Sequence, residues 1–300
     1  GIAFPDKTVN LLDPCCGTGD AVLRLALGHD SRCYGIELDE RAGELAAFAL
    51  TMKARARQRR FFNKRVKPNI TVLEKVSFSR EELDEYMTAV GRDLFTHGLR
   101  ETLQQFREAD NFGSLIVPKV TNVADVTATL EAKDLSGNLF LADTHQRVMS
   151  VLRMADYLSP RYAVVVANPP YMGGKGMNGR LSAWAKEAYP NSKSDLFAMF
   201  IERNLDLAVK GGAVAMITMQ SWMFLSSYEA LRARILGQHT ILGMAHLGAR
   251  AFDSIGGEVV STTAFVLARP HLPTYQGAYF RLVDGNSEAE KAAMFKEALA

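Results

Sequence analysis

Short apolar runs alternate along the chain with longer stretches in which apolar residues recur every three or four positions. The runs have the length of buried strands, and the periodic stretches have the spacing of amphipathic helices. Strands are predicted at Val9–Asp13, Cys33–Leu38, Ile70–Glu74, Ala163–Asn168, Ala213–Thr218, Ile241–Leu247 and Thr262–Ala268. Helices are predicted at Asp20–Leu27, Glu40–Arg60, Gln146–Leu158, Ser194–Val209 and Tyr228–Leu236. This alternation predicts an α/β fold with a seven-stranded, mostly parallel, doubly wound sheet.

The interval between the third and fourth predicted strands is too long for a single crossover connection. Residues 75–160 are therefore predicted to be an insertion, mostly helical, with helices at Arg80–Val90 and Leu99–Ala109. Asn111-Phe112-Gly113 is expected to interrupt them. Farther along the chain, Lys210-Gly211-Gly212 is typical of a helix end, since glycine tolerates the backbone conformation found there.

The charge balance and cysteine content limit the kinds of protein this chain can be. The net charge of +2 over 300 residues excludes a generic polyanion binder, so any nucleic-acid contact must come from a local patch. The cysteines, Cys15, Cys16 and Cys33, are odd in number and lack the spacing of a zinc site, which indicates a reducing compartment and no metal. No apolar run approaches 18 residues, so we expect a cytoplasmic protein without a membrane span.

The first predicted strand ends in a glycine turn, LLDPCCGTGD, that is suited to ligand binding. Gly17 and Gly19 let the backbone approach a ligand and expose amide groups where the next helix begins. The third glycine of a dinucleotide fingerprint is missing, and the carboxylate of Asp13 would repel a pyrophosphate. The turn therefore favours a ligand that carries an amine.

Glu37 lies at the end of the second predicted strand, about 20 residues after the glycine turn. A carboxylate at this position binds ribose hydroxyls in nucleotide-binding α/β sheets, although it can also cap the next helix. A ribose ligand without a phosphate signature indicates an adenosine derivative such as S-adenosylmethionine.

The fourth predicted strand runs into Asn168-Pro169-Pro170-Tyr171. The two prolines make this turn rigid and remove two amide donors. The turn presents hydrogen-bond acceptors and an aromatic ring face, which suit an amino group on a flat heterocycle.

Together, Asp13-Pro14-Cys15-Cys16-Gly17-Thr18-Gly19 and Asn168-Pro169-Pro170-Tyr171 resemble the paired motifs of N6-adenine DNA methyltransferases. Four stretches are similar to the methyltransferases of BREX phage-exclusion systems, the PglX family: GIELDERAGELAAFAL, KARARQRRFF, NFGSLI and NPPYMGGKGMN. The resemblance extends to about residue 285. The family's segment before the glycine turn is missing or reduced to Gly1–Thr8, and its long recognition region is absent. We therefore expect a catalytic fragment that binds its cofactor but methylates duplex DNA very little by itself.

The resemblance implies a class I S-adenosylmethionine-dependent methyltransferase fold. Residues 1–271 would form the catalytic domain, and residues 272–300 would begin a C-terminal linker or recognition region. It also implies a set of cofactor-binding residues: Asp13, Pro14, Cys15, Gly17, Gly19, Glu37 and Glu74. Related enzymes place an acid near the cofactor's adenine at the position of Glu74. Asp143 is the alternative if LFLAD is the true third strand.

The same resemblance implies transfer of a methyl group to adenine N6 in phage defence. The Asn168 side-chain oxygen and the Pro169 carbonyl would accept hydrogens from the amine, and Tyr171 would stack on an adenine flipped out of double-stranded DNA. A recognition domain and other defence-system proteins would be partners. Protein-glutamine or RNA amine methylation and non-catalytic cofactor binding in a defence complex remain open.

Two basic stretches have both a structural and a functional interpretation. Lys53–Lys67 either follows a DNA backbone or is a solvated helix end, and Phe61 and Phe62 within it are expected in the core. After the Asn-Pro-Pro-Tyr turn, Lys175 and Arg180 either contact phosphate or keep a mobile loop in solution.

Overall fold

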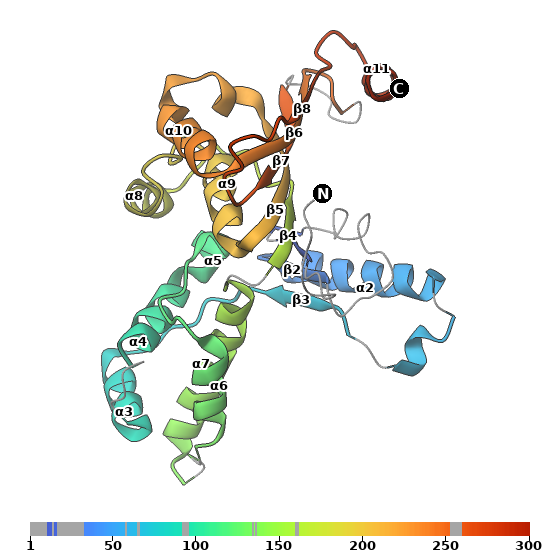
Figure 1. Ribbon diagram of the computed structural model, residues 1–300. Helices are drawn as coiled ribbons and strands as arrows, with labels where there is room; N and C mark the ends of the chain where they lie inside the picture. The colour runs from blue at the N-terminus through green and yellow to red at the C-terminus, as the bar shows by residue number, and fades with distance from the viewer. Residues whose placement is uncertain are drawn as a thin grey trace. The chain divides into compact units, whose positions relative to one another are not determined.

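A computed structural model describes residues 11–13, 15–16, 33–57, 59–64, 67–91, 96–133, 135, 137–159, 162–252 and 260–300. The chain divides into two compact units, which are considered separately. The first unit contains residues 1–14 and 161–300, and the second contains residues 15–160. Figure 1 labels the helices and strands of both.

The described sheet of the first unit contains parallel and antiparallel strands. In spatial order they are β1 (Leu11–Asp13), β4 (Tyr162–Ala167), β5 (Ala208–Met219), β7 (Thr262–Ala268), β6 (Thr240–Gly248) and β8 (Ala278–Arg281). Strands β1, β4 and β5 are parallel, and β7 runs antiparallel to both β5 and β6. Strand β8 is parallel to β6. The carboxyl ends of β1 and β4 therefore lie at the same edge of this sheet.

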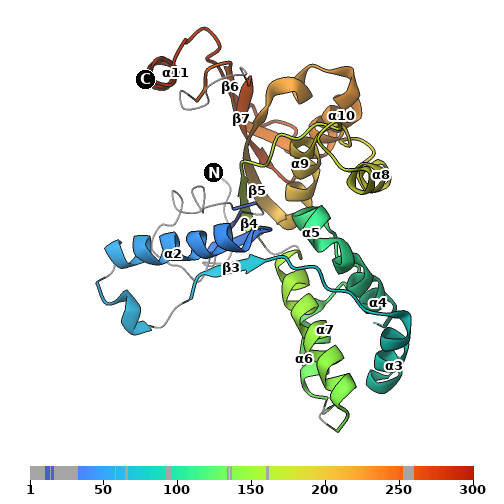
Figure 2. The same ribbon diagram turned by 180° about the vertical axis from the view of Figure 1, so that it is seen from behind.

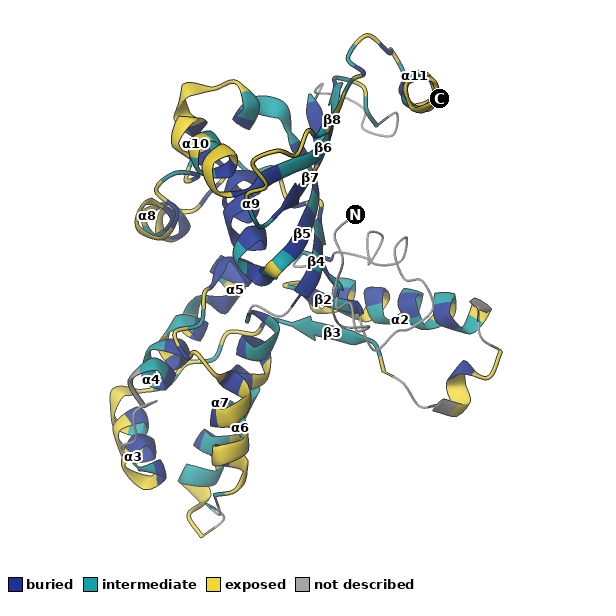
Figure 3. Ribbon diagram, viewed as in Figure 1, coloured by how far each residue is buried: buried dark blue, intermediate teal, exposed yellow. Residues whose placement is uncertain are grey.

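Helices cover one side of this sheet (Figures 1 and 2). The covering helices are α8 (Gly179–Ala188), α9 (Leu196–Leu207) and α10 (Glu229–Gln238). A further helix, α11 (Glu288–Leu299), follows β8 in the chain. Helix α9 packs on β4 and β5, and nearly all of its residues are buried (Figure 3). Short 3₁₀ turns, η5 (Gln220–Met223) and η6 (Ser226–Tyr228), join β5 to α10.

The second unit contains a parallel strand pair and a helical insertion. Strands β2 (Cys33–Glu37) and β3 (Asn69–Val72) pair with Glu37 opposite Val72. Helix α2 (Glu40–Arg57) packs on both strands, and Gly43 permits close contact because a Cβ there would lie 2.7 Å from Val72 Cγ2.

The insertion predicted at 75–160 is helical, as expected. It contains α3 (Arg80–Val90), α4 (Thr96–Gln105), η3 (Phe106–Glu108), α5 (Ala109–Phe112), η4 (Gly113–Leu115), α6 (Val123–Glu131) and α7 (Leu139–Tyr157). Helix α7 packs against α3, α4 and α6, and Figure 2 shows these helices together.

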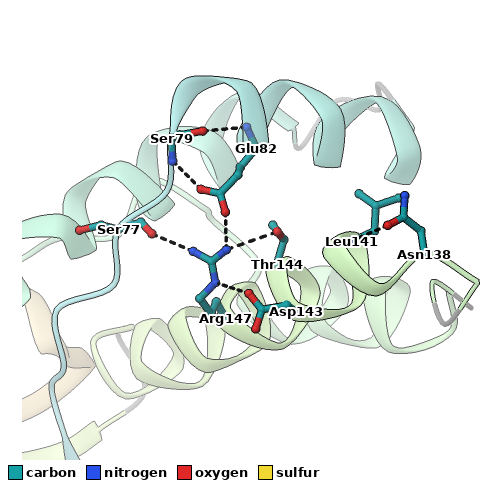
Figure 4. Close-up of polar contacts among 8 residues, drawn as sticks. All are labelled: Ser77, Ser79, Glu82, Asn138, Leu141, Asp143, Thr144 and Arg147. Atoms are coloured by element: carbon teal, nitrogen blue, oxygen red, sulfur yellow. Dashed lines mark hydrogen bonds and ion pairs between the residues drawn. The ribbon is translucent and has the colours of Figure 1, made fainter.

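Arg147 of α7 connects its helix to the start of α3 (Figure 4). Its guanidinium donates to the Glu82 carboxylate (2.5 Å), the Asp143 carboxylate (3.0 Å) and the Ser77 carbonyl (2.9 Å). Glu82 also completes a capping box with Ser79, so the same carboxylate begins α3 and binds α7. The pKa of Glu82 is lowered, first by the Ser79 amide and then by Arg147.

Asp143 is not at the end of a strand. The LFLAD segment belongs to α7, and the third strand is Asn69–Val72, so the condition for Asp143 as the adenine-binding acid is not met. Helix α7 begins seven residues before the predicted Gln146, because the Asn138 side chain caps it by accepting from the amides of Phe140 and Leu141.

Two further expectations differ from the structure. Helix α9 ends at Leu207, and Lys210-Gly211-Gly212 lies within β5, where Gly211 has φ +88° and the register with β4 shifts. The glycines therefore accommodate an irregular strand rather than end a helix. Strand β8 was not predicted, and through it residues 278–281 extend the sheet beyond β6.

Among the described helices, none combines the length and apolar character needed to cross a membrane.

Candidate active site

The Asn-Pro-Pro-Tyr turn follows β4 directly, beside the end of β1. Leu12 pairs with Val165, so Asp13 and Asn168 both stand at the carboxyl edge of two neighbouring parallel strands. Asp13 is 2% exposed, whereas Asn168 is exposed. Ligands of open α/β sheets bind at this edge. The first unit thus places the predicted catalytic turn and one predicted cofactor residue on adjacent strands.

The turn presents a hydrogen-bond acceptor in a fixed orientation. The Tyr171 hydroxyl donates to Asn168 Oδ1 across 3.2 Å, which orients the amide oxygen. Pro169 is buried and Pro170 is exposed, and neither has an amide hydrogen. The side-chain oxygen of Asn168 retains a second lone pair for another donor.

The ring of Tyr171 packs against an aromatic side chain of α9. Phe197 of α9 meets it nearly edge-on, with ring centroids 6.2 Å apart and planes at 85°. Phe197 is fully buried and also packs on Tyr228, 5.9 Å away between centroids. Burial raises the pKa of Tyr171 to about 12. Its hydroxyl therefore remains a neutral donor near pH 7 and cannot act as a base there.

The second unit holds two predicted cofactor acids at the ends of adjacent strands. Glu37 is the last residue of β2, and its Oε1 accepts from the amides of Leu38 (2.8 Å) and Asp39 (3.1 Å). These contacts hold the carboxylate close to the strand end. Glu74 lies two residues beyond β3, and its side chain is exposed. The Leu73 amide donates to the Glu37 carbonyl (2.9 Å), so both acids belong to the carboxyl edge of the β2–β3 pair.

The remaining predicted cofactor residues are placed only in part. Cys15 is half-buried. Pro14, Gly17 and Gly19 lie outside the described residues, as does the helix predicted at 20–27.

Sequence reasoning did not identify Asp195, Phe197 or Tyr228 as neighbours of the Asn-Pro-Pro-Tyr turn. One local signal was available, since Asp195 precedes an apolar run in the manner of a helix N-cap. Nothing local indicated that this helix start would lie against a turn more than 20 residues earlier.

The basic stretches are mostly at the surface. Lys175 is exposed in a turn, and Arg180 is exposed near the start of α8, a helix not predicted from the sequence. In the other stretch Phe61 is buried as expected, but Phe62 is 56% exposed, with the Arg55 guanidinium 5.9 Å from its ring centroid.

The family and the two curated relatives that match this chain are all described as methylases or methyltransferases. A family described as Eco57I restriction-modification methylase matches residues 31–252. The adenine-specific methyltransferase BrxX of Escherichia coli O9:H4 (strain HS) is 38% identical over 95% of this chain and 27% of that protein. The adenine-specific methyltransferase PglX of Lacticaseibacillus casei (strain Zhang) is 37% identical over 98% of this chain and 26% of that protein. The chain thus spans about a quarter of the length of these curated relatives.

Solved structures share the fold at low sequence identity. The cryo-EM structure of a DrdV–DNA complex matches 97% of this chain and 26% of that chain, with a TM-score of 0.55 and 14% identity. The predicted α/β fold is confirmed by the strands and helices described above, and this solved structure shares it.

Proposed function

Because the chain belongs to the Eco57I restriction-modification methylase family, we propose that it is the catalytic part of a DNA methyltransferase. The reaction is transfer of a methyl group to the N6 amine of adenine. The observation that carries this proposal is the Asn-Pro-Pro-Tyr turn at the carboxyl end of β4, in a chain 37–38% identical to proteins described as adenine-specific methyltransferases.

The turn supplies what an exocyclic amine needs to become a nucleophile. The lone pair of this amine is delocalised into the adenine ring, and acceptors for its two hydrogens favour a tetrahedral nitrogen. Asn168 Oδ1 and the Pro169 carbonyl are the proposed acceptors, because they are rigidly held where charge develops in the transition state. Tyr171 stacks on the base after it has left the helix. No strong base is needed before the transfer, because the neutral amine attacks the methyl group and its nitrogen loses a proton to solvent only after it has become positively charged.

The donor set fits S-adenosylmethionine, which supplies the methyl group when bound. Glu37, oriented by the amides of Leu38 and Asp39, is suited to ribose hydroxyls, and Asp13 is suited to an ammonium group. We propose that Glu74 lies near the adenine of the cofactor. Cys15, Pro14, Gly17 and Gly19 complete the proposed set as the backbone of the glycine turn.

The proposed substrate is double-stranded DNA with one flipped adenine, and the proposed setting is BREX-type phage defence. The setting is proposed because the chain resembles the BREX methyltransferases. The relatives BrxX and PglX are each about four times as long as the matched region. Recognition of the DNA site and contacts with other defence proteins would then involve chain or partners beyond these residues.

The test is a labelled-methyl assay with the full natural protein that carries this sequence. It is given host DNA, host RNA and host protein in parallel, and host DNA is also sequenced for N6-methyladenine with and without the gene. Label on DNA at one recurring adenine supports the proposal. Label on protein or RNA would replace it with the corresponding amine methyltransferase. Cofactor binding without any transfer would indicate a non-catalytic subunit.

A further inference from the structure

The segment that leaves the Asn-Pro-Pro-Tyr turn is bound to the first turn of α9 by one side chain. Asp195 is the N-cap of α9, and its Oδ1 accepts from the Phe197 amide across 3.3 Å, as a capping residue does. The same oxygen accepts from the Met172 amide across 3.0 Å. Met172 directly follows Tyr171, so one carboxylate oxygen both starts α9 and holds the exit of the catalytic turn.

Backbone hydrogen bonds on either side strengthen this connection. The Leu196 amide donates to the Met172 carbonyl (3.1 Å), and the Gly174 amide donates to the Ser194 carbonyl (3.1 Å). Gly173 and Asp195 form an antiparallel bridge between them. The two segments therefore lie side by side over several residues, and Asp195 stands at the centre of the contact.

Tyr171 is consequently fixed at three points. Its backbone is held through Met172, its ring rests on Phe197, and its hydroxyl bonds to Asn168. Two of these three supports come from residues 195 and 197 of the same helix start. A small displacement of this helix start would therefore move the ring and the amide together.

The contact with Met172 is more than helix capping requires. A serine or asparagine would satisfy the Phe197 amide, and the Met172 amide belongs to no helix. Asp195 is 7% exposed, so its carboxylate is held in a largely dry site beside these amides. Burial opposes its charge, and the pKa of Asp195 is raised despite the amides of Phe197, Met172 and Leu196.

We propose that Asp195 is a positioning residue for methyl transfer, acting through the Met172 amide to hold Tyr171 and Asn168 in their reacting arrangement. The inference rests on the proposed function. It predicts that loss of this contact slows the chemical step without weakening cofactor binding, because the residues proposed to bind S-adenosylmethionine are untouched.

The experiment compares four variants of the full natural protein. Asp195→Ala removes both hydrogen bonds. Asp195→Ser keeps an oxygen that can cap α9, but its side chain is too short to hold the Met172 amide as well. It therefore separates the effect of helix capping from the effect of the contact with Met172. Asp195→Asn keeps Oδ1 and removes the charge. Asn178→Ala is the matched control, because Asn178 is the N-cap of another helix, α8, and accepts from the Leu181 amide (2.8 Å).

We expect kcat to fall on the order of 10- to 100-fold in Asp195→Ala and Asp195→Ser, with KM for S-adenosylmethionine unchanged. Asp195→Asn should remain within a few-fold of wild type. Asn178→Ala should lower the melting temperature but preserve kcat. Amide hydrogen exchange at Met172 should accelerate in Asp195→Ala and Asp195→Ser while that of Val165 in β4 stays slow. If Asp195→Ala does not fold, Asp195→Ser provides the same comparison.

The inference is overturned by wild-type kcat in Asp195→Ser, by an equal loss of kcat in Asn178→Ala, or by unchanged exchange at Met172. Loss of kcat in Asp195→Asn as large as in Asp195→Ala would also contradict it, because the oxygen acceptor is retained. The exchange measurement needs no substrate. If the wild-type protein transfers no methyl group, the proposed function fails, and exchange at Met172 still decides whether Asp195 holds the turn.

Discussion

The hydroxyl of Tyr171 donates a hydrogen bond to the side-chain oxygen of Asn168 across 3.2 Å, linking the last and first residues of the Asn-Pro-Pro-Tyr turn. The bond fixes which end of the amide is presented as an acceptor. It also occupies the hydroxyl, so the ring face is the part of Tyr171 left for a flipped base. The orientation of the Asn168 side-chain oxygen therefore depends on Tyr171.

Asn168→Ala should abolish most methyl transfer while preserving cofactor binding. Removing one rigidly held group that stabilises developing charge costs about 100- to 1,000-fold in kcat. Single-turnover transfer to DNA by the full natural protein measures the chemical step, and calorimetry with S-adenosylmethionine measures binding. A variant that methylates at a near-native rate would refute the acceptor role.

Replacements of Tyr171 should separate its ring from its hydroxyl. Tyr171→Phe keeps the stacking surface and loses the bond to Asn168, so we expect a reduction of a few-fold. Tyr171→Ala also loses base stacking, which is worth about 1–3 kcal/mol per base. Fluorescence of 2-aminopurine at the target position reports the flipped base. Equal effects of the two substitutions would show that the hydroxyl, not the ring, matters.

Glu37→Ala should weaken binding of S-adenosylmethionine. Loss of hydrogen bonds between a charged acceptor and ribose hydroxyls costs about 1.5–3 kcal/mol. Glu40→Ala is the matched control, because Glu40 is an exposed acid in the first turn of the following helix. Calorimetry measures both affinities. Unchanged affinity in Glu37→Ala would remove the ribose assignment.

Arg147→Met should destabilise the helical insertion and change its response to acid. The side chains of Arg147 and Glu82 are 32% and 38% exposed, so we expect a loss of only about 1 kcal/mol. The pKa of Glu82 in the folded protein lies below its ordinary 4.5. Its contribution is therefore present above about pH 4.5 and is lost as pH falls through the lower folded value.

Urea unfolding between pH 3 and pH 7 measures this effect. In Arg147→Met the decline in stability at acid pH should be smaller but not absent, because the Ser79 amide also stabilises the Glu82 carboxylate. Arg80→Met is the control, since the Arg80 side chain is 87% exposed and lies 4.0 Å from its acidic partner. An identical acid profile in Arg147→Met and wild type would contradict the role of Arg147.

Local signals in the sequence determined several elements and the backbone restriction of the Asn-Pro-Pro-Tyr turn. Helix α3 has the predicted bounds, Arg80–Val90, because Ser79 and Glu82 form a capping box within four residues. Strand β7 matches its predicted range because its apolar run is short and bounded. The prolines of the Asn-Pro-Pro-Tyr turn restrict their own backbone, so the acceptors and the ring face could be proposed from the sequence before any tertiary contact was known.

The tertiary structure alone decided the features that depend on residues distant in sequence. Strand β8 exists because β6 offers it an edge, and Gly211 belongs to a strand because β4 and β7 pair with the residues around it. The same is true of the support behind Tyr171. Asp195 could be recognised as a helix cap, but its bond to Met172 spans 23 residues. Such a contact forms only when packing of α9 on the sheet brings two segments together, and no local propensity encodes it.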